Sequence, residues 1–340
     1  MRCVLRAVQA KAWREWMRKL SSARCTLTSA RAKTIIVKAQ ERAMPDSPFF
    51  HYNASFDAID TIQRHARTDL RPDPDYLTNF LGVKIAPRYF PGILDNREDT
   101  VEPIPIPANW HADIAEWAFA LRSVDMAKKS YRVIELGCGW GCWLNNTGAA
   151  ARNIDLAVEL IGIEGDEGHV GFANESLAAN GFSRDEFRII HGVAAPTRSQ
   201  ALFPVVDNPG ATWGSEPIFN ATPEQIQKAK RTGGYQVLEA YPLADLARGQ
   251  PIDLLHIDIQ GGETDFVKSN FEDIDRHVSR MLIGTHSRMI EGDLMRFLLD
   301  KGWTLEMERP CIFDLTDGKP QIRVDGVQGW VHRRRKMGWR

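Results

Sequence analysis

The sequence has few cysteines, and their spacing matches no structural zinc site. Five cysteines stand in 340 residues, an odd number that does not form a complete disulfide framework. Cys138 and Cys142 form a close pair, but no second pair completes a four-ligand zinc site. This usage fits a reducing compartment, so we expect a cytoplasmic protein. The five positions are Cys3, Cys25, Cys138, Cys142 and Cys311.

Long apolar runs and a strong net charge are also missing. No run approaches the roughly 20 apolar residues that cross a bilayer, so we expect no transmembrane segment. The formal net charge is −1, which gives the chain no general attraction to nucleic acid. These two absences argue against a membrane-spanning protein and against one that binds nucleic acid through its overall charge.

Basic residues are concentrated at the beginning of the chain, in a tail that we place at residues 1–45. Residues 1–42 hold eleven Lys and Arg side chains against Glu15 and Glu41. We interpret this stretch as a docking tail or a poorly ordered one. The alternatives are an amphipathic basic helix that contacts membrane or nucleic acid, and an organelle transit peptide.

Residues 46–128 are predicted to form a mostly helical extension that packs on the domain after it. Prolines are frequent up to residue 107, so longer helices are expected only at 56–66 and 110–127, the second one capped by Asn109. Residues 76–92, YLTNFLGVKIAPRYFPG, are too apolar for a free linker. We expect this stretch to pack on the main domain and to cover its site.

Residues 129–340 alternate strands with helices, which predicts a parallel sheet with helices on both faces. The expected strands are 132–136, 160–164, 187–193, 252–259 and 280–285, followed by a terminal pair at 304–309 and 329–332. The expected helices are 143–152, 168–180, 264–270 and 291–301. Residues 196–236 interrupt this alternation, and the capping sequence from Thr222 to Gln225 predicts one helix there. A segment of this length is a candidate lid or specificity element.

Three glycines at alternate positions follow the first strand, in residues 131–142, YRVIELGCGWGC. Glycine allows backbone N–H groups to approach a ligand closely, and the next helix directs its positive end at the same place. Dinucleotide dehydrogenases use G-x-G-x-x-G at this turn, whereas Gly137, Gly139 and Gly141 give G-x-G-x-G. The pattern therefore predicts a cradle for a nucleotide-like ligand, with Glu135 two residues before the first glycine.

Acidic side chains follow two other expected strands. Glu164 ends the second strand, where a carboxylate can accept hydrogen bonds from both hydroxyls of a ribose. Asp258 and Glu263 follow the fourth strand, at the edge where ligands of open α/β sheets bind. A carboxylate at the end of a buried strand is costly to desolvate without a partner, so Asp258 is a site candidate.

A histidine follows the fifth strand and reaches the same edge of the sheet. His286 could act as a general base for a hydroxyl acceptor, because its pKa suits neutral pH. A capping or structural role is the equal alternative. His256 lies deeper on the fourth strand and is interpreted as a core residue. Asp258, Glu263 and His286 could also hold a divalent metal, which we take as the less favoured alternative to a site without metal.

These stretches together resemble the FkbM-type family of S-adenosylmethionine-dependent methyltransferases, over about residues 131–332. That family carries D-L-L-x-I-D-I-E-G-x-E on its fourth strand, and residues 253–263 here are DLLHIDIQGGE. Gln260 replaces the usual glutamate. Gly302-Trp303 and Gly329-Trp330-Val331 also agree with the family pattern. The resemblance implies an α/β fold of the class I methyltransferase, Rossmann-like type, a doubly wound sheet with an antiparallel terminal strand pair.

The resemblance also implies the cofactor and the activity. S-adenosylmethionine would be the methyl donor, held by Glu164 at the ribose, and Asp258 would lie beside it. Asp258 or His286 would take the acceptor proton in the O-methylation of a hydroxyl on a sugar, glycan or natural product. A small-molecule or glycan acceptor is thus expected rather than nucleic acid. The remaining cofactor-binding residues implied are those of the turn, Glu135, Gly137, Cys138, Gly139 and Gly141.

Two other functions stay open at this point. A nicotinamide-dependent oxidoreductase would need the G-x-G-x-x-G spacing and a Tyr-x-x-x-Lys or similar hydride-transfer pair, and the chain shows neither. A methyltransferase-like fold could also serve as a binding module without catalysis, using basic segments such as residues 333–336 on nucleic acid. The sequence has no N/D-P-P-Y/F motif, the usual mark of enzymes that methylate amino groups, which favours an oxygen acceptor.

Overall fold

The computed structural model describes residues 47–315, 318 and 320–333. The predicted basic tail at 1–45 and residues 334–336 of the basic end lie outside the described residues. At the centre is an eight-stranded sheet in the order β1-β14-β17-β13-β12-β5-β6-β7. Its strands are β1 (Asn53–Ala54), β5 (Ser130–Leu136), β6 (Ala157–Glu164), β7 (Phe187–His191), β12 (Leu254–Ile257), β13 (Arg280–Thr285), β14 (Thr304–Arg309) and β17 (Gly326–Val331).

The direction of these strands identifies the fold. From β7 through β6, β5 and β12 to β13 all neighbours are parallel, and β17 then pairs antiparallel with both β13 and β14. Two parallel strands thus lie on each side of the first strand, β5: β6 and β7 on one side, and β12 and β13 on the other. The last strand, β17, inserts beside the fifth. This is the class I methyltransferase arrangement of a Rossmann-like sheet, and the predicted fold with its antiparallel terminal pair is confirmed.

Helices cover the sheet on both faces. They have to, because the side chains of its strands are buried on both sides. Along β5, Tyr131 and Val133 pack with one group of helices, whereas Ile134 and Leu136 pack with the other. The first group is α4 (Ile114–Asp125), α5 (Cys142–Arg152) and α6 (Glu167–Ala179). The second is α8 (Leu243–Ala247), α9 (Glu263–Ser269), α10 (Phe271–His277) and α11 (Arg288–Asp300). Among the described residues, no helix is both long and apolar enough to cross a membrane.

The extension before β5 differs from the expected, mostly helical one. Besides α4 it has one α-helix, and proline-rich loops carry a small three-stranded sheet in the order β3-β2-β4. It is nevertheless part of the core, because β1 pairs with β14 and residues from 77 to 94 belong to the same apolar cluster as α4, α5 and α6. Its elements are η1 (Pro48–Phe50), α3 (Ala58–His65), β2 (Leu77–Thr78), β3 (Lys84–Ile85), η2 (Pro87–Tyr89) and β4 (Thr100–Val101).

The prediction that Asn109 caps the helix before β5 is wrong. Helix α4 begins at Ile114, and Asp113 caps it by accepting the N–H of Ala115. The side chain of Glu116 in turn accepts the N–H of Asp113, which completes a capping box. Asn109 instead accepts N–H groups of the turn that precedes the helix. A reciprocal pair of caps outcompetes a single one, so the helix starts later.

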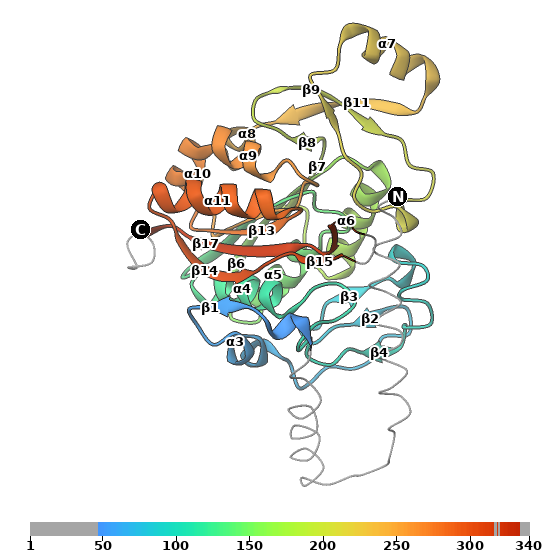
Figure 1. Ribbon diagram of the computed structural model, residues 1–340. Helices are drawn as coiled ribbons and strands as arrows, with labels where there is room; N and C mark the ends of the chain where they lie inside the picture. The colour runs from blue at the N-terminus through green and yellow to red at the C-terminus, as the bar shows by residue number, and fades with distance from the viewer. Residues whose placement is uncertain (1–46, 316–317, 319, 334–340) are drawn as a thin grey trace.

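The segment between the third and fourth parallel strands forms a second small sheet, seen at the top of Figure 1, in the order β10-β9-β11-β8. The predicted capping box at Thr222 and Gln225 is present at the start of α7. The sheet extends beyond the expected limits of 196–236. Its elements are β8 (Val193–Ala194), β9 (Ser199–Pro204), η3 (Pro209–Ala211), β10 (Ile218–Phe219), α7 (Pro223–Thr232) and β11 (Tyr235–Tyr241). A last hairpin, β15 (Ile312–Asp314) and β16 (Gln321–Val324), separates β14 from β17.

Candidate active site

The glycine turn connects β5 to α5 at the carboxyl edge of the parallel strands. Gly137, Gly139 and Gly141 all have positive φ, at 72°, 54° and 75°. A Cβ on Gly137 would stand 2.2 Å from the carbonyl oxygen of Asp258, so only glycine fits there. The turn therefore lies directly against the end of β12, beside the backbone of Asp258, the expected catalytic residue.

Two residues of the expected cradle lie beneath the turn. Glu135 is buried, and its carboxyl oxygens accept the N–H groups of Trp143 and Leu144 in the first turn of α5. Burial raises the pKa of Glu135 to about 8, against the effect of these hydrogen bonds. Cys138 is also buried, and burial raises the pKa of its thiol well above the ordinary value. Both side chains therefore support the turn from inside the protein.

Glu164 joins the glycine turn to the start of α6. One carboxyl oxygen accepts the N–H of Gly139 at 2.8 Å, and the other accepts the N–H of Asp166 at 2.8 Å. A carboxylate offers about four acceptor directions, so two hydrogen bonds leave capacity for further donors. The residue is 8% exposed. Glu164 therefore lies beside the second glycine of the turn and links the turn to α6.

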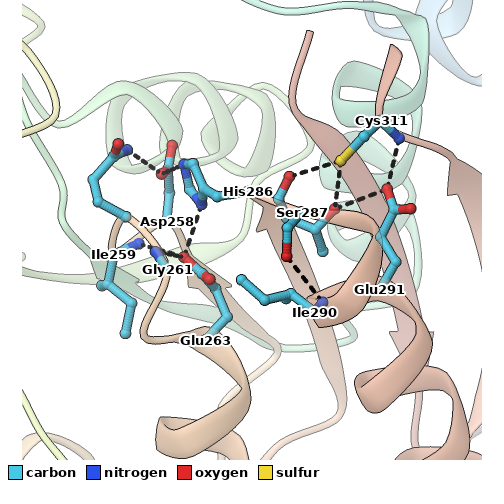
Figure 2. A network of polar contacts seen from close by, with 11 residues as sticks. Asp258, Ile259, Gly261, Glu263, His286, Ser287, Ile290, Glu291 and Cys311 are labelled. Atoms are coloured by element: carbon cyan, nitrogen blue, oxygen red, sulfur yellow. Dashed lines mark hydrogen bonds and ion pairs between the residues drawn. The ribbon is translucent and has the colours of Figure 1, made fainter. Parts of the chain in front are cut away.

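Asp258, Glu263 and His286 meet at the ends of β12 and β13, as Figure 2 shows. Nδ1 of His286 lies 2.9 Å from Oε1 of Glu263, and Nε2 lies 3.3 Å from Oδ1 of Asp258. The side chain of Glu263 is fully buried, whereas that of Asp258 is 37% exposed. The imidazole thus bridges an internal carboxylate and one that faces the outside.

The charge on His286 follows from these two neighbours. Burial alone would lower the pKa of the imidazole, but the hydrogen bonds to Asp258 and Glu263 and their negative charges outweigh it. The pKa rises to about 11, so both ring nitrogens carry protons at neutral pH. A doubly protonated imidazole donates two hydrogen bonds and cannot accept a proton.

Gln260 adds a donor to the same carboxylate. Its side-chain amide donates to Oδ1 of Asp258 at 3.0 Å, and its backbone has a positive φ of 59°. Such a conformation is strained for a residue with a side chain, and strain of this kind is concentrated at functional sites. The glutamate usual in the resembled family could not donate this hydrogen bond when ionised.

A second network in Figure 2 fixes the loop that carries His286. Oγ of Ser287 accepts the N–H of Ile290 and caps α11. The buried carboxyl of Glu291 accepts the N–H of Cys311 and the hydroxyl of Thr285. The loop after β13 is therefore tied to the last hairpin, and this restricts where the imidazole can lie.

Two other polar residues, His256 and Glu116, have strongly shifted pKa values. His256 is buried as expected, and burial lowers the pKa of its imidazole to about 4. Glu116 was expected only as part of a helix. Burial raises the pKa of its carboxyl to about 8; the charge of Asp113 adds to this effect, and that of Asp258 adds less. Within the described part of the chain, no three His, Cys, Asp or Glu side chains are arranged to hold a metal ion.

The sequence does not single out Trp213, because no local pattern marks it as a residue near the glycine turn. Trp213 of the insertion lies over Gly139, between the rings of Phe90 and His169. The expected packing of residues 76–92 on the main domain is confirmed, since Tyr89 and Phe90 belong to its apolar cluster. Contacts between segments this far apart in the chain require the folded structure.

Comparison with known proteins places this site in a family. The chain is 55% identical over 254 residues to a protein of Jannaschia sp. (strain CCS1) that is assigned as a methyltransferase, which covers 75% of this chain and 91% of the relative. The chain belongs to this methyltransferase family. No family model matches the methyltransferase.

Two solved structures show its likeness to more distant proteins. The methyltransferase FkbM from Methylobacillus flagellatus KT is 12% identical, with a TM-score of 0.40, over 64% of this chain and 55% of that one. Precorrin-6y C5,15-methyltransferase from Geobacter metallireducens GS-15 is 11% identical, with a TM-score of 0.36, over 63% and 86%. The substrates that these names state belong to those proteins.

Proposed function

We propose that this methyltransferase transfers a methyl group from S-adenosylmethionine to a hydroxyl oxygen. The observation that carries the proposal is Asp258, whose partly exposed carboxylate His286 and Gln260 orient and whose backbone carbonyl packs against Gly137 of the glycine turn. A methyl donor held on that turn would be adjacent to a group able to accept a proton. Donor cradle and proton acceptor thus occupy one edge of the sheet.

The residues around the turn fit the proposed cofactor. The positive φ angles of Gly137, Gly139 and Gly141 open the backbone toward a ligand, and the first turn of α5 lies behind it. Glu164 stands beside Gly139 with acceptor capacity for the vicinal hydroxyls of a ribose. When bound, the cofactor supplies a methyl group that its sulfonium already activates.

The chain then has to align the acceptor and to take its proton. A hydroxyl becomes a good nucleophile only as its proton is accepted, and a positioned base contributes about 10²–10⁴-fold to the rate. Of the two candidates, Asp258 takes this role in the proposal. His286 carries its full complement of protons, with its pKa at about 11, and so acts as a positioning group. Glu263 in turn fixes Nδ1 of His286.

The acceptor class rests on the same carboxylate. In the proposal it is a hydroxyl on a sugar, a glycan or a natural product, and nucleic acid is not a partner. Residues 258–261 are DIQG, without the N/D-P-P-Y/F motif of enzymes that methylate amino groups. An oxygen acceptor loses a proton during transfer, and Asp258 is placed to receive it.

Cofactor binding is the first test. S-adenosylhomocysteine is expected to raise the melting temperature of the full chain, and NAD is not. Protection by NAD alone would refute the proposal and favour an oxidoreductase. The absence of protection by either compound, together with a salt-dependent shift of RNA or DNA, would favour a binding module.

Methyl transfer is the second test, with isotopically labelled S-adenosylmethionine and a panel of hydroxyl acceptors. Asp258→Asn is expected to bind S-adenosylhomocysteine as the wild type does and to lose at least about 100-fold in kcat. Asp265→Asn is the matched control. Asp265 is exposed on α9, so this substitution makes the same chemical change outside the site. Full activity in Asp258→Asn would remove Asp258 from the chemistry.

A further inference from the structure

Side chains of the insertion between β7 and β12 pack closely against three glycines of the core, at the glycine turn and at the start of α6. A Cβ on Gly139 would meet the ring of Trp213 at 3.0 Å. One on Gly165 would meet the ring of Phe203 at 2.4 Å, and one on Gly168 would meet Pro209 at 2.5 Å. A side chain at any of these three glycines would therefore push the insertion away from the turn and from α6.

Trp213 is held between two other rings. Its centroid lies 4.4 Å from that of Phe90, with 11° between the planes, and 4.0 Å from that of His169, with 13°. The indole N–H donates to the carbonyl of Gly210 at 3.0 Å. Nε2 of His169 lies 2.9 Å from the carbonyl oxygen of Pro209. Extension, core and insertion thus converge on this one ring.

The position of the ring excludes a ligand from one face of the turn. Because a Cα–Cβ bond is about 1.5 Å long, the Trp213 ring lies within about 4.5 Å of the Cα of Gly139. A ligand layer between them would need about 7 Å, two van der Waals separations of about 3.5 Å. Glu164, which accepts the N–H of Gly139, is itself only 8% exposed.

We propose that Trp213 is an intramolecular plug of the cofactor site, which leaves the Gly139 face when S-adenosylmethionine binds. This inference rests on the proposed function, since it assumes that the turn holds this cofactor. Gly214 follows the ring with a positive φ of 87°, a conformation that glycine adopts readily, and is the residue at which the segment would turn. The site competent for binding is then only a fraction of the population, and the apparent Kd rises in inverse proportion to that fraction.

Removal of the ring tests the plug directly. Trp213→Ala is expected to bind S-adenosylhomocysteine at least about tenfold more tightly, as measured by calorimetry. The tighter binding is expected to come from faster association. Phe90→Ala, which removes one stacking partner without changing the insertion, is expected to shift the Kd in the same direction. Phe219→Ala is the matched control, an exposed aromatic on β10 of the same insertion, and is expected to leave the Kd unchanged.

The direction of the change decides the outcome. Weaker or unchanged binding by Trp213→Ala would refute the plug and make Trp213 a wall of the occupied site or a bystander. Hydrogen exchange of residues 209–214 in the wild type gives an independent readout: S-adenosylhomocysteine is expected to speed it, and slower exchange would refute the plug. Failure of the proposed function looks different, because then neither the wild type nor Trp213→Ala binds S-adenosylhomocysteine.

Discussion

The protonation state of His286 determines which residue can act as the base, and it can be measured. The pKa of its imidazole rises from 6.5 to about 11, because hydrogen bonds and charges from Asp258 and Glu263 outweigh the burial that opposes them. At about 1.36 kcal/mol for each pKa unit, the fold favours the imidazolium by on the order of 6 kcal/mol. His286 is therefore expected to remain charged throughout the neutral range.

Asp258→Asn perturbs this arrangement with little change in shape. It removes one of the two negative neighbours and leaves Glu263 at 2.9 Å from Nδ1. Since one close opposite charge shifts a pKa by about 1–3 units, the pKa of His286 is expected to fall by that amount and to stay above 6.5. Imidazole 15N spectra follow the titration, and His286→Gln identifies the signal among the nine histidines.

The same shift predicts how stability changes with pH. A raised pKa contributes stability that is fully present below pH 6.5 and is lost as the pH rises toward about 11. The advantage of the wild type over His286→Gln in urea denaturation should therefore fall by about 1.4 kcal/mol per pH unit between these limits. A titration midpoint below about 8, or one that Asp258→Asn leaves unchanged, would refute this account and return His286 to the candidates for general base.

Three further changes test other parts of the structure. Asp113→Ala is expected to lower the free energy of unfolding by about 3–5 kcal/mol, because it leaves the buried guanidinium of Arg309 without its carboxylate; a loss under about 1 kcal/mol in urea denaturation would contradict this. Gln260→Leu is expected to lower kcat about tenfold without changing donor Kd, since Asp258 loses a donor, and an unchanged kcat would show that the amide is dispensable. Glu164→Ala is expected to weaken S-adenosylhomocysteine binding at least about tenfold by calorimetry, and unaltered binding would place the ribose elsewhere.

The central sheet was predictable because its signals are local. β5 is rich in β-branched and aromatic residues and ends in a turn that only glycine can form, and Gly137 is confirmed as a position without room for a Cβ. The alternation of strands and helices fixes a parallel sheet, and the carboxyl edge of such a sheet collects Glu164, Asp258 and His286 whatever the loops do. The sequence therefore predicts that these side chains lie at one edge of the sheet, and the structure brings Asp258 and His286 into contact there.

The division of labour within the site was not predictable, because it depends on distances between strands. The sequence does not distinguish Asp258 from His286 as a base, because it does not show that the buried carboxylate of Glu263 lies beside Nδ1 of His286. The start of α4 shows the same limit at the level of a cap, where Asp113 and Glu116 displaced Asn109. In both cases two groups act reciprocally, and a pattern of single residues does not contain that information.

The extension and the insertion, the two segments outside the core sheet, meet over the glycine turn. The core edge supplies the glycine turn and Asp258, which suit a methyl donor and a proton acceptor but describe no particular substrate. Trp213 and Gly214 are adjacent in the insertion, and one lies on Gly139 while a Cβ on the other would stand 2.9 Å from Oε1 of Gln260. A movement that uncovers the turn therefore also removes a neighbour of the amide that orients Asp258. Because Phe90 of the extension stacks on the same indole, the extension and the insertion meet over Gly139 in one aromatic contact that the sheet itself does not specify.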